Sequence, residues 1–487
     1  MKPLKDILYK VTINAVVGST SIAINKIEFD SRKIESNDVF VAIVGAISDG
    51  HDYINKAISD GAKAIVCQML PEDLVADITY IEVENSNKAL AFMAANYYEN
   101  PSENLKLVGT TGTNGKTTVS SLLYQLFKKA GYKVGLLSTV KIMVDNTEYK
   151  ATHTTPDSLT INKYLQLMSE DGVEFCFMEV SSHGIHQSRT EGLYFTGGIF
   201  TNLSHDHLDY HNSFAEYRDV KKAFFDALPK TAFCLVNTDD KNSLVMIQNT
   251  NAKKYTYALK TYADYKAQIL ENQFGGLLLK LNDNEVWTKL IGNFNAYNLL
   301  AIYATSELLG LDNEESLRYI SELESVSGRF EYFVSEEKIT AIVDYAHTPD
   351  ALKNVLETIN AIRTKNEELI TVVGCGGDRD AEKRPKMGHI ASALSTKVIF
   401  TSDNPRTENP QTIIENIEAG VEPQNFKKVV SILDRKQAIK TACQMAQPND
   451  IILIAGKGHE TYQEINGKRS DFDDYKVVAK LLRQLQK

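Results

Sequence analysis

One short stretch limits the fold of this chain more than any other feature of its sequence. It runs Leu105-Lys-Leu-Val-Gly-Thr-Thr-Gly-Thr-Asn-Gly-Lys-Thr-Thr118 and predicts a β-strand, a glycine-rich turn and a helix that begins near Lys116. Gly112 and Gly115 allow the backbone to curl so that its N–H groups point inward, and the helix N-terminus adds partial positive charge. Such a turn binds nucleotide phosphates. Lys116 can reach the terminal phosphate oxygens, and the Thr117 hydroxyl can ligate Mg²⁺.

The stretch departs from the strict Walker pattern at one position. Thr110 stands where that pattern has a glycine, and the nearest glycine is Gly109. The departure indicates a variant subclass of phosphate loop. A glycine-rich loop before an ordinary amphipathic helix is the alternative without a ligand. The loop alone does not distinguish a motor, a switch, a kinase or a ligase.

Length and composition predict an ordinary folded protein with several domains. The 487 residues suffice for about three domains. The net charge of −10 argues against nucleic acid as a partner, which would require a basic face. The chain shows neither a signal peptide nor a run of about 20 apolar residues, so we expect no membrane partner and a cytoplasmic location. The five cysteines lack metal-type spacing and are expected to be reduced core residues.

Alternating apolar strands and helical runs predict an α/β protein with three domains. Residues 1–100 form a small α/β unit, and Asn100-Pro-Ser-Glu103 is a linker. Residues 101–327 hold the phosphate loop in a mostly parallel sheet with helical crossovers. Residues 328–487 again alternate strands, at 369–373, 397–401 and 450–455, with helices.

Several polar side chains stand where parallel strands end, which is where ligands bind in such sheets. Glu179 closes an apolar strand, so it is either a Mg²⁺ ligand or one member of a structural ion pair. Asn295 and Asn298 lie at a helix start, where capping and ligand contact are equally compatible with the sequence. Lys221 and Lys222 fit surface positions of a helix by pattern alone.

Five of the ten histidines lie between residues 183 and 211. The spacing contains no His-x-x-x-His pair on a helix and no cysteine, so a zinc site is the less favoured interpretation. We expect one or two of these histidines to lie near the phosphates and the others to form hydrogen bonds with the backbone of loops.

Three polar loops follow apolar strands of the third domain and should meet at one edge of its sheet. They are Gly374-Cys-Gly-Gly-Asp-Arg-Asp380, Ser402-Asp-Asn-Pro-Arg406 and Gly456-Lys-Gly-His-Glu460.

Taken together, these residues resemble the Mur ligase family, the ATP-dependent amide ligases of peptidoglycan synthesis, and within it the MurE type. The resemblance spans the whole chain and rests on nine motifs in order: Gly112-Thr-Asn-Gly-Lys-Thr-Thr118, His153-Thr-Thr-Pro156, Met178-Glu-Val-Ser-Ser-His183, Asp206-His-Leu-Asp-Tyr-His211, Asn295-Ala-Tyr-Asn298, Gly328-Arg329, Asp344-Tyr-Ala-His347, Gly376-Gly-Asp-Arg379 and Asp403-Asn-Pro-Arg406.

The resemblance implies a uridine-nucleotide-binding domain, a central P-loop ATPase and a Rossmann-like domain for the incoming amino acid. The implied reaction is attack of the D-glutamyl carboxylate of UDP-MurNAc-L-Ala-D-Glu on the γ-phosphoryl group of ATP, after which an amine displaces phosphate from the acyl phosphate. Charge neutralisation should dominate such catalysis.

The resemblance also implies roles for single residues. Lys116 and Glu179 would be catalytic together with His207 and Lys221. Two Mg²⁺ ions are implied, with Thr117, Glu179, His207 and Lys221 as ligands, Lys221 being carbamylated. This implication replaces the surface position that the pattern alone predicts for Lys221. The implied ATP contacts are Gly112, Thr113, Asn114, Gly115, Lys116, Thr117, Thr118, Asn298, Arg329, Asp344 and His347.

The remaining implied contacts belong to the other two substrates. Those to the UDP-MurNAc-dipeptide are Phe29, Ser31, Ala46, Ile47, Ser48, His153, Thr154, Thr155, Ser181, Gln187 and Arg189. His153 stands where many relatives have asparagine. Those to the amino acid are Arg379, Asp403, Asn404, Pro405, Arg406, Gly456 and Glu460.

In this family, members with Asp-Asn-Pro-Arg at the position of residues 403–406 add meso-diaminopimelate, whereas lysine-adding relatives lack the arginine. The chemistry agrees, because meso-diaminopimelate has a second carboxylate that an arginine fork can bind. The alternatives are lysine as the acceptor, a sibling ligase such as folylpolyglutamate synthetase, and a P-loop switch that makes no bond. We expect a monomer with only small-molecule substrates as partners.

Overall fold

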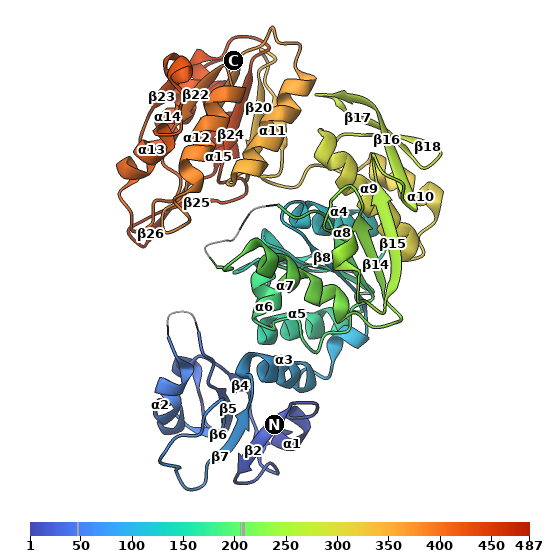
Figure 1. Ribbon diagram of the computed structural model, residues 1–487, viewed down its shortest axis with the longest axis vertical. Coiled ribbons are helices and arrows are strands. Elements are labelled where there is room, and N and C mark those ends of the chain that lie inside the picture. Colours follow the sequence, from blue (N-terminus) through green and yellow to red (C-terminus); the bar gives the residue numbers. More distant parts are fainter. Residues whose placement is uncertain (46–47, 205, 207–209) are drawn as a thin grey trace.

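The computed structural model describes residues 1–45, 48–204, 206 and 210–487. The chain forms three α/β units in a row, each built on its own main sheet, with the first unit at one end and the third at the other (Figure 1). The fold class predicted from the sequence is confirmed.

The N-terminal unit contains a five-stranded sheet in the order β2-β7-β6-β5-β4, in which only β2 is antiparallel to its neighbour. Its strands are β2 (Ile13–Val17), β4 (Ile27–Glu28), β5 (Asp38–Val41), β6 (Ala62–Cys67) and β7 (Thr79–Val83), with β1 (Lys2–Pro3) paired to β3 (Ala23–Ile24). Its helices are α1 (Leu4–Ile7), α2 (Ile54–Ser59) and α3 (Ser86–Tyr97), and short 3₁₀ turns cover Ser31–Lys33, Gly50–Tyr53 and Pro101–Glu103.

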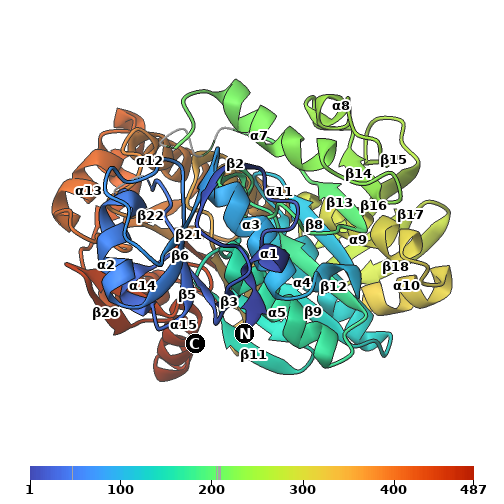
Figure 2. The same cartoon turned by 90° about the horizontal axis from the view of Figure 1, so that it is seen from below.

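The central unit contains an eleven-stranded sheet in the order β11-β10-β9-β12-β8-β13-β14-β15-β16-β17-β18. The strands from β9 to β16 in this order are parallel, and antiparallel strands extend both edges. The bounds are β8 (Lys106–Thr111), β9 (Val134–Leu137), β10 (Lys141–Val144), β11 (Thr147–Lys150), β12 (Phe175–Glu179), β13 (Gly197–Phe200), β14 (Phe233–Asn237), β15 (Lys253–Ala258), β16 (Tyr265–Gln273), β17 (Gly276–Leu281) and β18 (Asn284–Thr288). Figure 2 shows this sheet running across the molecule from β11 to the β16–β18 meander. This antiparallel meander is absent from the elements predicted from the sequence.

Helices cover both faces of the central sheet. Apolar residues of α4 (Lys116–Lys129), α9 (Asn293–Leu308) and α10 (Asn313–Ser321) form the core on one face, and those of α5 (Ser158–Glu170) and α7 (Phe214–Asp226) form the core on the other. The short helices α6 (Ser182–His186) and α8 (Ser243–Met246) follow β12 and β14. The phosphate loop therefore projects from a strand that is buried between two packed layers.

The C-terminal unit contains a six-stranded sheet in the order β19-β20-β24-β21-β22-β23, parallel except for β19. The bounds are β19 (Glu331–Val334), β20 (Thr340–Asp344), β21 (Leu369–Val373), β22 (Lys397–Phe400), β23 (Val429–Ser431) and β24 (Ile451–Ala455). Helices α11 (Pro349–Ile362), α12 (Lys383–Leu394) and α13 (Pro410–Glu418) pack on one face, and α14 (Arg435–Met445) and α15 (Asp474–Gln484) on the other. A 3₁₀ turn covers Pro423–Lys428, and β25 (Tyr462–Ile465) and β26 (Lys468–Asp471) form a separate hairpin.

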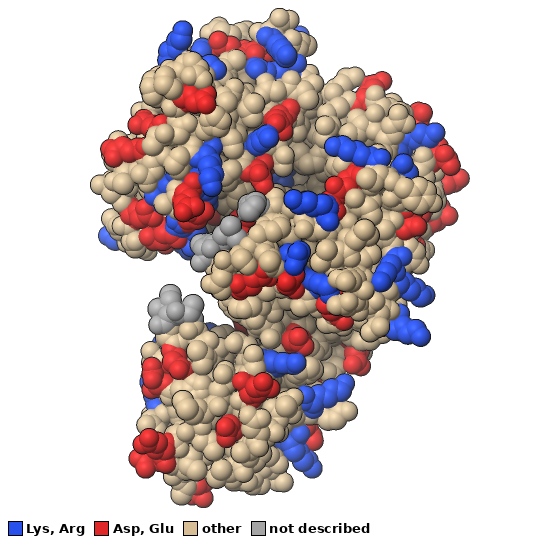
Figure 3. All heavy atoms as spheres, viewed as in Figure 1, with Lys and Arg blue, Asp and Glu red and all other residues tan. Residues whose placement is uncertain are grey.

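The central and C-terminal units share an apolar contact. Ile291 of the central unit belongs to the same buried cluster as Phe330, Leu352 and Val355, and the partly buried Phe294 packs against this cluster. On the face in Figure 3 the surface is hollowed between these two units, and acidic and basic side chains are interspersed. The limits proposed at residues 100 and 327 stay predictions.

Two further observations concern composition. All five cysteines are free and buried, as expected for reduced core residues. No helix within the described ranges is both long and apolar enough to cross a bilayer.

Candidate active site

The phosphate loop connects β8 to α4 and is packed too closely for side chains at its glycines. Gly112 has φ +148°, and a Cβ atom there would lie 2.0 Å from Thr201 Oγ1. Gly115 has φ +90°, and its Cβ would lie 2.7 Å from Asn298 Oδ1. The loop is thus held against the end of β13 and against α9, and Thr113 N donates to Asn202 O at 2.8 Å. The predicted strand, turn and helix are all present.

Lys116 folds back onto the phosphate loop. Its Nζ donates to the carbonyl oxygens of Gly112 at 2.9 Å and Thr113 at 2.8 Å. Burial lowers the pKa of this amine, while the nearby Glu179 and Asp206 carboxylates act in the opposite direction. The ammonium lies where a nucleotide phosphate bound by the loop would meet it.

Glu179 ends β12 with its side chain buried at the mouth of the loop. Oε2 accepts the Thr117 hydroxyl at 2.9 Å, and Oε1 accepts Thr139 N at 2.7 Å. Within the described residues this carboxylate forms no ion pair, so the structure does not support the ion-pair interpretation of Glu179. A carboxylate beside a threonine hydroxyl is the hard oxygen donor set that Mg²⁺ prefers, so the residues fit this ion.

Lys221 and Lys222 point in different directions from α7. The Lys221 side chain is buried, its Nζ donates to Gly112 O at 3.0 Å, and it lies 4.8 Å from the centre of the Tyr217 ring. Burial, followed by the nearby Lys116 ammonium, lowers the pKa of Lys221 well below its ordinary value. Lys222 instead pairs with Asp226. The surface position predicted for Lys221 from pattern alone is wrong. The face of α7 that carries Lys221 packs over the phosphate loop, and this contact buries the side chain.

The histidine-rich segment is only partly described, and His205 and His207 lie outside the described residues. His183 stacks on Tyr210 with ring centres 4.0 Å apart, and His186 Nδ1 lies 2.9 Å from the Tyr210 hydroxyl. His211 is buried 3.8 Å from Glu216, and burial lowers the pKa of its imidazole. The part of the chain that the structure describes contains no group of three His, Cys, Asp or Glu placed to hold a metal.

A second polar cluster lies beside Glu179. Thr155 Oγ1 donates to Glu179 O and accepts Ser181 N, both at 2.9 Å. Arg189 donates to Thr155 O and, through Nε and Nη2, to Gln187 Oε1. These four residues, predicted to contact one substrate, are therefore joined in one network, Ser181 through its backbone N–H. Thr139 Oγ1 donates to Thr154 Oγ1 at 3.1 Å, which joins Thr154 to this network. His153, by contrast, is exposed.

The residues expected at the uridine end lie apart from this network, in the N-terminal unit. Ser31 is buried in a 3₁₀ turn, and both Phe29 and Ser48 are exposed. Ala46 and Ile47 lie outside the described residues.

A cavity of about 840 Å³ lies between the central and C-terminal units. Arg329 crosses it: its Nη2 donates to Thr117 Oγ1 at 3.2 Å, and its guanidinium lies 4.4 Å from the centre of the Tyr345 ring. Asp344 accepts Phe330 N at 2.6 Å, and burial raises the pKa of this carboxyl to about 6 although Arg329 opposes the shift. Burial lowers the pKa of His347 to about 4. All three predicted residues line this cavity together with the phosphate loop.

Asn295 and Asn298 do not cap α9. The helix begins after Gly292 without a side-chain cap, so the capping interpretation is wrong. Asn295 Nδ2 donates to Ile291 O, and Asn298 Nδ2 donates to Asn295 Oδ1, which leaves Asn298 Oδ1 beside Gly115. Asn298 therefore lies on the wall of the cavity, next to the phosphate loop.

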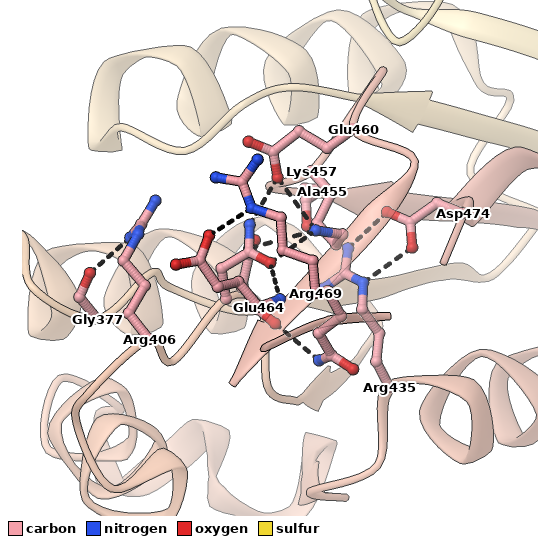
Figure 4. A network of polar contacts seen from close by, with 12 residues as sticks. Gly377, Arg406, Arg435, Ala455, Lys457, Glu460, Glu464, Arg469 and Asp474 are labelled. Atoms are coloured by element: carbon pink, nitrogen blue, oxygen red, sulfur yellow. Dashed lines mark hydrogen bonds and ion pairs between the residues drawn. The ribbon is translucent and has the colours of Figure 1, made fainter. Parts of the chain in front are cut away.

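The three polar loops of the C-terminal unit meet as predicted. Gly377 N donates to Asn404 O at 2.9 Å, and Lys457 Nζ donates to Asn404 Oδ1 at 3.1 Å. Figure 4 shows the resulting network, in which Arg406 points toward Gly377 and donates to its carbonyl oxygen at 2.6 Å. Arg379, by contrast, is exposed and donates to Asp378 O.

Family models and full-length relatives identify the family. The models described as Mur ligase family, catalytic domain, Mur ligase middle domain, and Mur ligase, glutamate ligase domain match residues 23–98, 110–306 and 328–458. The chain is 54% identical to a UDP-N-acetylmuramoyl-L-alanyl-D-glutamate--2,6-diaminopimelate ligase from Cytophaga hutchinsonii, over 99% of this chain and 100% of the relative. A relative with the same name from Phocaeicola vulgatus is 52% identical over 98% of both chains.

The chain belongs to the Mur ligase family. The resemblance inferred from the motifs is confirmed, and with it an ATP-dependent ligase. A solved structure of a UDP-N-acetylmuramoyl-L-alanyl-D-glutamate--2,6-diaminopimelate ligase matches with a TM-score of 0.70 at 30% identity, covering 100% of this chain and 99% of the other. The MurF ligase from Thermotoga maritima in complex with ADP shares the fold, with a TM-score of 0.62 at 18% identity over 94% of this chain and 97% of the other.

Several polar residues of this Mur ligase site were not singled out from the sequence. Asp239 lines the cavity and accepts a hydrogen bond from the Tyr297 hydroxyl at 2.9 Å, and Thr139 N donates to Glu179. Asp239 and Thr139 each follow a parallel strand closely, so the strand-end rule that found Glu179 could have found them. Lys457 lies in the loop Gly456–Glu460, which the same rule found. It was not singled out within that loop, because one lysine in a glycine-rich loop resembles a surface residue.

Proposed function

We propose that this protein adds meso-diaminopimelate to UDP-MurNAc-L-Ala-D-Glu in peptidoglycan precursor synthesis, through an acyl phosphate and with release of ADP. The names of relatives that are 54% and 52% identical across nearly the full chain support this proposal. The Asp403–Arg406 loop supports the choice of amino acid, because its arginine can bind the carboxylate that lysine lacks.

The observation that carries the proposal is the link that Arg329 makes between the phosphate loop and the amino-acid loops. Arg329 donates to Thr117 and stacks on Tyr345, and the Tyr345 ring lies 5.1 Å from that of His459. His459 precedes Glu460 in the loop that also holds Lys457. A nucleotide on the phosphate loop would thus lie beside the site that we assign to the amine donor, as a ligase requires.

In the proposed reaction the central unit activates the carboxylate. Lys116 and Arg329 neutralise charge on the transferred phosphoryl group. Thr117 and Glu179 would hold one Mg²⁺ ion and His207 with a carbamylated Lys221 a second, and these ions would supply positive charge that offsets the negative charge of the phosphates. A buried amine with a lowered pKa suits carbamylation, because only the neutral amine attacks CO₂.

The other substrates are assigned to the remaining groups. The cluster of Thr155, Ser181, Gln187 and Arg189 would bind the muramoyl dipeptide, and the N-terminal unit would bind its uridine end. Arg406 and Arg379 would bind the acid groups of the amino acid, while Asp403, Glu460 and the Gly456 carbonyl would bind its distal ammonium. We further propose domains 1–100, 101–327 and 328–487, and a cytoplasmic monomer.

Product mass spectrometry tests the proposal. The purified protein is incubated with UDP-MurNAc-L-Ala-D-Glu, ATP and Mg²⁺ in the presence of equal concentrations of L-lysine and meso-diaminopimelate. We expect the diaminopimelate tripeptide, with one phosphate released per product. A lysine product would overturn the amino-acid assignment, and vigorous ATP hydrolysis without the two acceptors would indicate a P-loop switch instead.

A further inference from the structure

The proposed reaction assigns no role to one buried cation of the C-terminal unit. Lys457 follows β24, and its side chain has 0% exposure. Its Nζ donates to Glu460 Oε2 at 3.0 Å and to Asn404 Oδ1 at 3.1 Å, and it lies 4.0 Å from Asp403 Oδ1 (Figure 4). Lysine is almost never fully buried without partners, and here its partners are residues that we assign to the amino acid.

Lys457 and Asn404 together fix the position of Glu460. Both donate to Glu460 Oε2, with Asn404 Nδ2 at 2.7 Å. Asn404 Oδ1 also accepts a hydrogen bond from Glu464 N at 2.9 Å, so this oxygen is already paired within the protein. Glu460 Oε1 accepts no hydrogen bond from the part of the chain that the structure describes. One oxygen of Glu460 is therefore held and the other is left for a ligand.

The backbone before Lys457 is fixed by a buried ion pair. Arg435 and Asp474 form this fully buried pair through two hydrogen bonds of 2.7 and 2.8 Å. Arg435 Nη2 also donates to Ala455 O at 3.1 Å, at the end of β24. Lys457 thus lies two residues after a strand end that this buried pair fixes.

Apart from the exposed Arg379, the charges at the proposed amino-acid site balance. Asp403 and Glu460 carry two negative charges, and Lys457 and Arg406 carry two positive ones. A ligand end with both an ammonium and a carboxylate leaves this balance unchanged. A ligand end with only an ammonium leaves Arg406 without an anionic partner and adds a net positive charge.

We propose that Lys457 is a positioning and specificity-determining residue of the amino-acid site. It holds Glu460 for the distal ammonium and sets the charge balance that favours a diamino diacid over a diamino monoacid. The inference rests on the proposed function, and it assigns to Lys457 a role that acts through Glu460 and Asn404 rather than through the substrate.

The substitution Lys457→Met tests it, because methionine fills much of the same volume without charge. We expect the ratio of kcat/KM for meso-diaminopimelate to that for L-lysine to fall about tenfold or more, since removal of the cation matches the site to an ammonium alone. The change should reside mainly in the amino-acid KM, with kcat and the KM for ATP nearly unchanged. Lys476→Met on α15, where the lysine side chain is 80% exposed, is the matched control.

The double substitution Lys457→Met with Glu460→Gln distinguishes an effect of charge on substrate preference from an effect of misfolding. Loss of one member of a buried pair destabilises a protein more than loss of both, so the double variant should fold even where the single one does not. It restores the charge balance, and we expect its preference for meso-diaminopimelate to stay within about threefold of the wild type. Thermal unfolding of each variant shows whether it is folded.

The outcomes distinguish this inference from the proposed function. If the wild type makes no diaminopimelate tripeptide, the proposed function is wrong. If the wild type makes it and folded Lys457→Met keeps the wild-type ratio, the role of Lys457 is wrong. A double variant that loses the preference also overturns it, because charge balance would then not set specificity.

Discussion

At the scale of single residues, burial governs the behaviour of the ionisable groups at the phosphate loop. Lys116 and Lys221 both donate to the carbonyl of Gly112, and burial lowers the pKa of each. Glu179 supplies the nearby negative charge, held by Thr117 and Thr139. A metal ion or a phosphate that enters this site therefore meets fixed groups with little water to screen them.

Glu179→Gln isolates the charge of that carboxylate. The amide keeps the shape and can still bond to Thr117 and Thr139, so we expect a folded protein. Loss of the charge should lower kcat by about 100-fold and raise the Mg²⁺ concentration needed for half-maximal activity. Kinetics across a Mg²⁺ titration measure both effects. Thr117→Ser, which keeps the hydroxyl, should change them little. An unaltered Mg²⁺ dependence in Glu179→Gln would show that this carboxylate holds no metal.

Arg406→Ala examines the carboxylate end of the amino-acid site. Arg406 has φ +51° and donates through Nη1 to Gly377 O, which leaves other guanidinium donors for a ligand. Loss of a bidentate contact should raise the KM for meso-diaminopimelate about tenfold or more while kcat changes little. Initial rates over a range of diaminopimelate concentrations provide the measurement. Arg318→Ala on α10, where the side chain is 72% exposed, serves as the control. An unchanged KM would show that the assignment of Arg406 is wrong.

At the scale of elements, the phosphate loop owes its shape to its contact with β13 as well as to its own sequence. Gly112→Ala places a Cβ 2.0 Å from Thr201 Oγ1, which forces β13 and the loop apart. Gly131 offers a matched control, because it also has a positive φ, +90°, but no atom lies within 4 Å of the position that an alanine methyl group would take there. We expect Gly112→Ala to lose most ATP binding, measured by calorimetry, and Gly131→Ala to keep it. Equal affinities in the two variants would contradict this role of the contact.

The sequence predicted elements whose pattern is local. The strand that Glu179 closes and the helix that begins at Lys116 are present as predicted, because apolar runs and glycines determine them. The β16–β18 meander and the β25–β26 hairpin were missed. The hairpin lies against Arg406, whose backbone N donates to Glu464 O, and both of its strands carry mostly charged or polar residues. A hairpin without an apolar face gives no periodicity to detect.

The same reasoning explains the outcome for the site. Residues at the ends of parallel strands could be predicted, because topology alone brings strand ends together. The burial of Lys221 and Lys457 could not be predicted from pattern, since both are lysines that only tertiary packing buries. For Lys221 the family resemblance supplied what local pattern could not.

At the scale of the whole molecule, the junction between the central and C-terminal units contains groups that respond to acid. Burial lowers the pKa of His347 to about 4 and that of His459 to about 3, and Arg329 also disfavours the imidazolium of each. Burial shifts the pKa of Asp344 in the same junction the other way, to about 6. At neutral pH the imidazoles of His347 and His459 are therefore neutral, and the Asp344 carboxylate is ionised.

These shifts predict a loss of stability in mild acid. Between pH 6.5 and about 4 the unfolded chain binds protons at both histidines and the folded chain does not, so the free energy of unfolding falls as the pH falls. Asp344 acts oppositely between about pH 6 and its ordinary pKa, because the folded chain takes up its proton first. The two histidines outweigh the one carboxyl, and we expect a net loss of about 2 kcal/mol between about pH 7 and about pH 5.

Thermal unfolding of the ligand-free protein at about pH 7 and about pH 5 measures this effect. The variant His347→Asn with His459→Asn should show a smaller fall in Tm between the two pH values than the wild type, whatever its Tm at neutral pH. His389→Asn on α12, where the side chain is 50% exposed, should behave as the wild type. A double variant with the full wild-type fall would place the acid-sensitive groups elsewhere in the molecule, because the two imidazoles would then bind no more protons in the unfolded chain than in the folded one.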